Sequence, residues 1–162
     1  MKFVDALEDL PSASDLGSRS GLEFMRAILA GELAAPPIAR NLGFQLTDVE
    51  DGSATFEGTP EFGALNPMRG VHGGWYGTIL DSAMACAVMT KVPQGAIYTT
   101  LEYKINITRA IPVGTPVRTI GSVDHAGRTT SVASGEIRGI EDNRLYATGT
   151  TTCLIMKAPN AG

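Results

Sequence analysis

The chain has 162 residues and a net charge of −4 at pH 7, with 43% hydrophobic and 19% charged residues. This length and composition suit one soluble globular domain with a sizeable core, and no basic stretch of the kind that binds nucleic acid is present in the sequence. The first residues, MKFVDALEDLP, carry acids that are atypical of a signal peptide, so we expect a cytoplasmic protein that does not bind membranes.

The N-terminal part is expected to form a loose arm followed by one helix. Residues up to about Ser20 contain a proline and several serines, which favour turns over regular structure. Residues 20–33 then place apolar side chains three or four positions apart, behind a serine that can cap a helix: Leu22, Met25, Leu29 and Leu33, after Ser20. We assign residues 1–35 to this arm and helix and residues 36–158 to the main domain.

The main domain begins with a predicted hairpin and ends with predicted strands. Two alternating runs between residues 44 and 60 flank Glu50-Asp51-Gly52, a strong turn signal. A loop at residues 64–71 precedes a long apolar helix at residues 72–91. Four β-rich runs follow from Ala96, with turns near residues 125–127 and 141–143. This order predicts an α+β protein in which one long helix packs on an antiparallel sheet.

Asp81 is the most informative residue of the long helix. It is the only carboxylate between residues 70 and 90, a stretch apolar enough to be buried. Burying an unpaired carboxylate is costly, so the group must be paired, neutralised or used in chemistry. A charge at the centre of this stretch also argues against a membrane span.

The two faces of this helix differ in character. With about 100° per residue, one face carries small residues beside the acid: Gly74, Gly77, Thr78, Asp81 and Ala85. A second face is expected to pack on the sheet: Trp75, Ile79, Ser82, Cys86 and Met89. The first N–H groups of the helix, freed by glycines, could stabilise an oxygen that becomes negative during a reaction.

These residues resemble the hotdog-fold acyl-CoA thioesterases, in the branch related to phenylacetate degradation (PaaI-like) and to 4-hydroxybenzoyl-CoA thioesterases. The resemblance rests on Asn66, on His72-Gly73-Gly74 and on Asp81, and it extends over residues 36–157. It implies a hotdog fold, with an antiparallel sheet wrapped around one central helix and an extra N-terminal helix here. It also implies a homodimer, with a homotetramer as a further step.

The resemblance assigns a role to each site residue. The Gly73 N–H would polarise the thioester carbonyl, while Asp81 would activate water or attack the carbonyl directly. Asn66 and His72 would orient the water or the thioester, and Thr100 (or Thr99) would help to position the water. The remaining residues would contact the CoA substrate: Gly74, Arg109, Arg128, Thr129 and Thr130. Asp81 and Asn66 would come from opposite protomers.

The function implied is hydrolysis of an acyl-CoA thioester, with an aromatic or medium-chain acyl group, to a free acid and CoA. CoA enters as part of the substrate, and no metal or other cofactor is expected, since the two histidines and two cysteines lack ligand spacing. Two alternatives stay open: an enoyl-thioester hydratase or dehydratase that uses His72, and a non-catalytic acyl-CoA-binding module. Asp81 could instead be a structural acid paired with Arg69 or Arg109, and Asn66 a loop cap.

Overall fold

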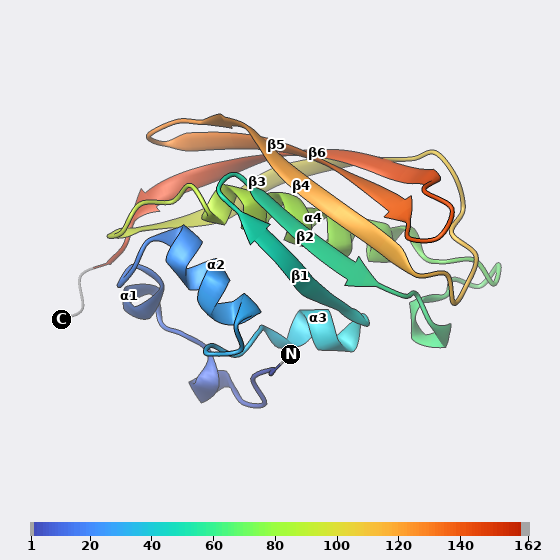
Figure 1. Ribbon diagram of the computed structural model, residues 1–162, viewed down its shortest axis with the longest axis horizontal. Helices are drawn as coiled ribbons and strands as arrows, with labels where there is room; N and C mark the ends of the chain where they lie inside the picture. Colours follow the sequence, from blue (N-terminus) through green and yellow to red (C-terminus); the bar gives the residue numbers. More distant parts are fainter. Residues whose placement is uncertain (1, 160–162) are drawn as a thin grey trace.

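A six-stranded antiparallel sheet and one long helix dominate the computed structural model, which describes residues 2–159 (Figure 1). The helix α4 (Gly73–Met89) lies across one face of the sheet, whose strand order is β1-β2-β4-β5-β6-β3. The strands are β1 (Phe44–Glu50), β2 (Ser53–Gly58), β3 (Ala96–Ile107), β4 (Val117–Ala126), β5 (Thr130–Gly139) and β6 (Leu145–Lys157). The predicted α+β architecture, an antiparallel sheet around one central helix, is confirmed.

The strand connections lie close to the predicted turns. Asp51 and Gly52 join β1 to β2, and Gly52 has a φ of 88°, which glycine adopts without steric cost. The β4–β5 connection falls at residues 127–129, two residues after the predicted turn, because β4 continues through His125. The β5–β6 connection at residues 140–144 contains the predicted turn.

Short helices precede β1, and α2 (Gly21–Leu29) among them packs against α4 and β1. The others are η1 (Leu7–Asp9), α1 (Ala13–Leu16) and α3 (Pro37–Asn41). Ser20 caps α2 as predicted, and its hydroxyl accepts a hydrogen bond from the Glu23 backbone N–H. The buried face of α2 is formed by Met25 and Ile28, which join the main core, whereas Leu29 stays 37% exposed.

Glycines let α4 lie directly on the sheet. A Cβ added to Gly121 of β4 would overlap the backbone of Ala83, and one added to Gly135 of β5 would lie 2.9 Å from Met84 Cγ. Ala83 and Met84 therefore face the sheet. The expectation that Ser82, Cys86 and Met89 pack there is wrong, because they line a cavity closed by the N-terminal helices. None of the described helices is both long and apolar enough to cross a membrane.

Candidate active site

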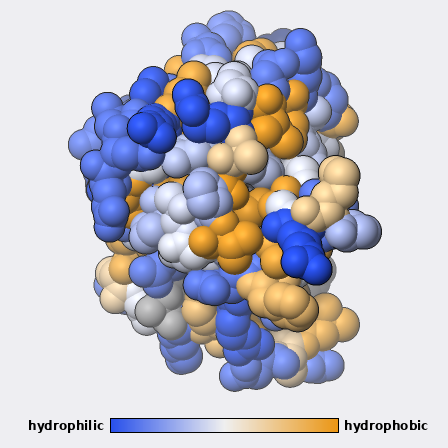
Figure 2. Space-filling view, turned by 90° about the vertical axis from the view of Figure 1, so that its right-hand side faces the viewer, coloured by the Kyte–Doolittle hydropathy of each residue, from blue (hydrophilic) through white to orange (hydrophobic). Residues whose placement is uncertain are grey.

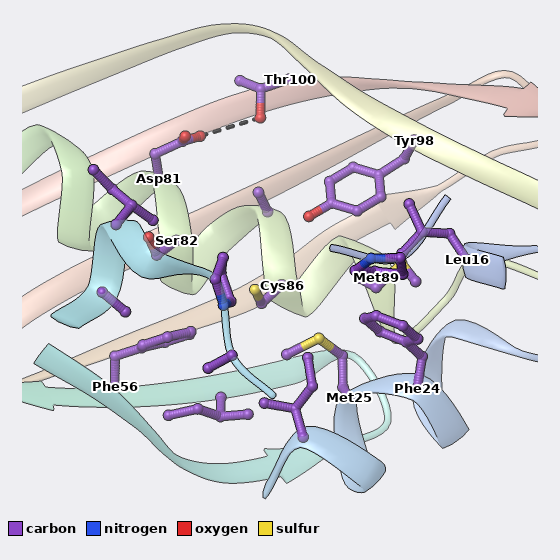
Figure 3. Close-up of a pocket in the computed structure, with 18 of the residues that line it drawn as sticks. Leu16, Phe24, Met25, Phe56, Asp81, Ser82, Cys86, Met89, Tyr98 and Thr100 are labelled. Atoms are coloured by element: carbon purple, nitrogen blue, oxygen red, sulfur yellow. Dashed lines mark hydrogen bonds between the residues drawn. The ribbon is translucent and has the colours of Figure 1, made fainter. Parts of the chain in front are cut away.

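Asp81 and Thr100 form the acidic part of the site. Asp81 projects from the middle of α4 and is half-buried, and the Thr100 hydroxyl on β3 donates a hydrogen bond of 3.1 Å to Asp81 Oδ1 (Figure 3). Burial raises the pKa of Asp81 above its ordinary value, and the hydrogen bond from Thr100 offsets part of that rise. A carboxylate with a raised pKa is a stronger base, so Asp81 is suited to accept a proton.

Among the described residues, Asp81 has no cationic partner that would make it a structural residue. Within the described part of the chain it takes part in no ion pair, and neither Arg69 nor Arg109 does so with it. The two sulfhydryl groups nearby are poor competitors for its role, since burial raises the pKa of Cys86 to about 12 and also raises the pKa of Cys153. Asp81 is therefore the group of this cluster that can act as a base or nucleophile near neutral pH.

Asn66 organises the loop that leads into α4. Its Oδ1 accepts hydrogen bonds from the backbone N–H groups of Met68 (2.9 Å) and Gly70 (3.1 Å). The loop also holds Arg69 in the left-handed region with a φ of 63°, which is uncommon for a residue with a side chain. Asn66 is thus a loop cap, and its amide Nδ2 remains as a donor toward a ligand.

His72 is the N-cap of α4, and Gly73 is its first residue. The His72 Nδ1 accepts a 2.9 Å hydrogen bond from the Gly74 N–H, so the neutral ring carries its proton on Nε2. The Gly74 N–H is consequently occupied, and the expected contact of Gly74 with the substrate stays a prediction. The Gly73 N–H has no hydrogen-bond acceptor among the described residues and stands at the positive end of the helix dipole.

Strand β3 runs antiparallel alongside α4 and shows how far apart these groups lie. Thr100 meets Asp81, Tyr103 lies over Gly77, and Ile107 packs beside Gly73, where an added Cβ would be 3.7 Å from Ile107 Cδ1. Asp81 follows Gly73 by eight residues, which corresponds to ~12 Å along the helix axis. One chain therefore holds its acid and its free N–H in two separate places.

The candidate CoA contacts are also divided between two ends of the sheet. Arg109 is exposed just after β3, at the Gly73 end of α4. Arg128, Thr129 and Thr130 are exposed at the opposite end, where Thr130 pairs with Leu154 of β6 and Leu154 pairs with Thr99 of β3. A single protomer does not bring these residues together.

An apolar cavity of about 450 Å³ extends from Asp81 under the N-terminal helices (Figure 3). Met25 of α2, Cys86 of α4 and Tyr98 of β3 line it, and burial raises the pKa of Tyr98 well above its ordinary value. None of these three residues was expected in the site from the sequence. The one available signal was the apolar spacing in residues 20–33, which shows that a helix covers something but not what it covers.

Two large apolar side chains are exposed in the segment that precedes α4. Figure 2 shows this end of the molecule, where hydrophobic and hydrophilic surface alternate. Phe62 and Met68, which flank Asn66 in the sequence, are 87% and 86% exposed. Exposed side chains of this kind are typical of a contact with a partner or a ligand.

Known proteins share this fold and parts of this sequence. Residues 69–146 match the model of the thioesterase superfamily. A phenylacetic acid degradation-related protein from Ralstonia eutropha JMP134 superposes with a TM-score of 0.74, at 29% identity, over 81% of this chain and 98% of that chain. The family match and the shared fold support a hotdog-fold thioesterase. Its expected relationship to the phenylacetate-degradation branch is confirmed, and the enzyme is a thioester hydrolase.

Two further structures resemble this thioesterase. A conserved protein from Pseudomonas aeruginosa is 28% identical, with a TM-score of 0.68, and the match covers 74% of this chain and 93% of that one. A hypothetical thioesterase protein from Streptococcus pneumoniae TIGR4, solved with coenzyme A, is 24% identical with a TM-score of 0.67, over 76% and 93% of the two chains. A comparison with curated proteins gave no significant match. Within residues 2–159, no cluster of three or more His, Cys, Asp or Glu side chains is placed to hold a metal ion.

Proposed function

We propose that this thioesterase hydrolyses acyl-CoA thioesters at a site shared by two protomers. Asp81 and Thr100 would come from one protomer, and Asn66, His72 and Gly73 from its partner. The observation that carries this proposal is the ~12 Å between Gly73 and Asp81 on one helix, since a single carbonyl cannot contact both groups of the same chain. The CoA complex of the similar Streptococcus pneumoniae protein supports CoA as the carrier of the acyl group.

The edge strand β3 supports the pairing of two protomers. It is twelve residues long and ends the sheet, and Leu101 and Tyr103 on it are 58% and 45% exposed. A long unpaired edge with apolar side chains is a template for another strand. In an antiparallel pair of β3 strands centred near Tyr103 and Lys104, Ile107 of one protomer would stand opposite Thr100 of the other. Since Ile107 packs on Gly73, that register would bring Gly73 of the partner subunit toward Asp81.

The chemistry then follows from the groups that are free to act. The Gly73 N–H donates to the thioester oxygen and stabilises the negative charge that forms on it. The Asp81 carboxylate takes a proton from water as the water oxygen attacks the carbonyl carbon, and the C–S bond then breaks to release the CoA thiolate. Thr100 holds the Asp81 Oδ1, which leaves Oδ2 for the water. Direct attack by Asp81 would give an anhydride instead and release the CoA thiolate. When water then adds to the Asp81 carboxyl carbon, a single turnover in ¹⁸O-labelled water leaves ¹⁶O from Asp81 in the acid and ¹⁸O on Asp81.

The remaining polar residues support the orientation of the substrate. The Asn66 Nδ2 and the His72 Nε2–H are donors at the same end of α4 as Gly73, and they suit the thioester or the attacking water. His72 already uses Nδ1 as a helix cap, which makes it a poor shuttle for hydration of an enoyl thioester. Arg109 of one protomer and the segment 128–130 of the other would approach one CoA molecule from two sides.

The test of this function is thiol release from acyl-CoA, followed with DTNB. The wild-type enzyme should release CoA from phenylacetyl-CoA or from medium-chain acyl-CoA. The Asp81→Asn variant should keep its fold and lose about 10²–10⁴-fold in kcat, the usual contribution of a general base. Tight binding of acyl-CoA without thiol release would make the protein a binding module, and wild-type rates in the variant would remove Asp81 from the mechanism.

A further inference from the structure

The cavity beside Asp81 is built by parts of the chain that lie far apart in the sequence. Helix α4 contributes Ser82, Cys86 and Met89, and the β1–β2 hairpin contributes Phe44 and Phe56. The outer wall comes from the N-terminal part, with residues between Leu10 and Ala39 (Figure 3). From these walls we infer that the cavity is an acyl-binding chamber, and that the N-terminal part, through Met25, selects thioesters of medium-chain aliphatic acids. This inference rests on the proposed hydrolysis of acyl-CoA.

The chemistry of the walls points to an uncharged, apolar occupant. Among the described residues that line the cavity, Asp81 carries the only carboxyl group and no side chain is cationic. The Cys86 thiol and the Tyr98 hydroxyl have pKa values that burial raises. Phosphate groups of CoA would find no cation there, whereas an alkyl chain would be surrounded by methyl, methylene and aromatic groups. Because Asp81 lies at the wall, a thioester carbonyl held near it would direct the acyl tail into this space.

The size of the cavity exceeds what one aromatic ring needs. An apolar cavity of ~150 Å³ is enough to admit benzene in a protein. The volume of about 450 Å³ is roughly three times as large, so a phenylacetyl group would leave most of it empty. Empty apolar space costs stability, and a longer chain would fill it.

The length of the cavity sets the expected length of the chain. It extends from Asp81 to Met89, eight residues along α4, or ~12 Å at 1.5 Å per residue. An extended chain advances ~3.6 Å for three bonds, so about ten bonds cover this distance. Acyl groups of about eight to twelve carbons therefore match the chamber.

The wall formed by α2 is fixed in place. A Cβ added to Gly21 would overlap the Met89 carbonyl oxygen, so the start of α2 lies directly against the end of α4. The Gly21 N–H donates a 2.9 Å hydrogen bond to the Val92 carbonyl, and the Ser20–Glu23 capping box secures the first turn. Met25 is 3% exposed, and its side chain points toward Cys86 at the centre of the chamber (Figure 3).

The test compares acyl-CoA chain lengths in Met25 variants. Wild-type kcat/KM should peak between octanoyl-CoA and dodecanoyl-CoA. Met25→Trp adds bulk to the chamber and should lower the decanoyl-to-butyryl ratio of kcat/KM by about 100-fold or more, while Met25→Ala should move the optimum to longer chains. Leu29→Trp is the matched control one turn along α2, outside the chamber, and should leave the ratio within about twofold.

A second measurement separates this inference from the proposed function. Decanoic acid below its micellar concentration should raise the Tm of the wild-type protein and of Leu29→Trp, and Met25→Trp should abolish that shift. The inference would be overturned, and the proposed hydrolysis left intact, if kcat/KM peaked at butyryl-CoA or phenylacetyl-CoA and the decanoyl-to-butyryl ratio did not change in the Met25 variants. If no acyl-CoA is hydrolysed but decanoic acid still raises the Tm in a Met25-dependent way, the proposed function is overturned and the assignment of the cavity as an acyl-binding chamber stands.

Discussion

Replacing Thr100 by valine tests how the protein sets the basicity of Asp81. The substitution keeps a β-branched side chain of similar shape on β3, but it removes the hydroxyl that donates to Asp81 Oδ1 at 3.1 Å. That hydrogen bond favours the charged carboxylate and lowers its pKa, against the rise caused by burial. In Thr100→Val the pKa of Asp81 should therefore rise further.

The size of the shift follows from the geometry. A hydrogen bond to a charged group contributes about 1.5–3 kcal/mol, and about 1.4 kcal/mol corresponds to one pKa unit. The distance of 3.1 Å is long for a hydroxyl donor, and Asp81 is only half-buried, so the lower end applies. We expect the pKa of Asp81 to rise by about one unit in Thr100→Val.

The assay is the pH profile of kcat/KM for thiol release from one acyl-CoA. Activity requires ionised Asp81, so the acid limb of the profile should move about one pH unit upward in Thr100→Val. Thr100→Ser should retain the wild-type limb, because it keeps the donor. Thr99→Val is a matched control, since Thr99 is exposed and forms no hydrogen bond with Asp81 among the described residues. An unchanged limb in Thr100→Val, or an equal shift in Thr99→Val, would refute this account of the Asp81 pKa.

Three further substitutions test other parts of the structure. Gly73→Pro deletes the free N–H at the first helical position, where proline is compatible with the helix start and with the extended His72 before it (φ −64°, ψ 137°). The value of kcat should fall about 10²–10³-fold while the circular dichroism spectrum stays unchanged. The control Gly73→Ala keeps the N–H and should stay near the wild-type kcat. Asp81→Asn should raise the free energy of unfolding by about 1 kcal/mol at pH 8 in urea titrations, with the gain shrinking toward pH 4. The native pKa of Asp81 lies above its ordinary value of 3.8, so the folded state binds the proton more tightly than the unfolded state does. The stability of the wild-type protein therefore falls as pH rises from 3.8 through the native pKa. A stability gain in Asp81→Asn that does not depend on pH would contradict this reasoning. Gly121→Ala should destabilise the fold by about 1–3 kcal/mol, because its Cβ would overlap the backbone of Ala83. The control Gly63→Ala, whose Cβ meets open space, should leave the stability unchanged. Equal urea midpoints for the two variants would disprove the close contact at Gly121.

Local patterns were enough to predict the layers of this fold. A few neighbouring residues encode the turn at Asp51-Gly52, the cap at Ser20 and the start of the long helix after His72, and the structure has all three. The hydrophobic pattern of α4 was less informative about which face of the helix meets the sheet. Since both faces of the helix are apolar, periodicity alone could not tell the face that meets the sheet from the face that meets α2.

The site itself shows what a sequence can and cannot specify. The resemblance led us to expect that Thr100, or alternatively Thr99, positions the water, but it did not predict the hydrogen bond from Thr100 to Asp81. The hydrogen bond from the Gly74 N–H to His72 Nδ1 was not expected either, because it depends on the local geometry of the helix start. Residues such as Met25 and Tyr98 carry no chemical signal, so only the packing of distant segments reveals that they enclose the space beside Asp81.

The most direct test of a shared site is complementation between two inactive variants. Asp81→Asn and Gly73→Pro would be co-expressed with different affinity tags, and the mixed dimers would be purified through both tags. Each mixed dimer contains one site in which Asp81 of one chain faces Gly73 of the partner subunit with neither altered. The account predicts about half of the wild-type kcat per dimer from two variants that are each nearly inactive alone. A mixed dimer as inactive as its parents would contradict it, because that result would place both groups in the same chain.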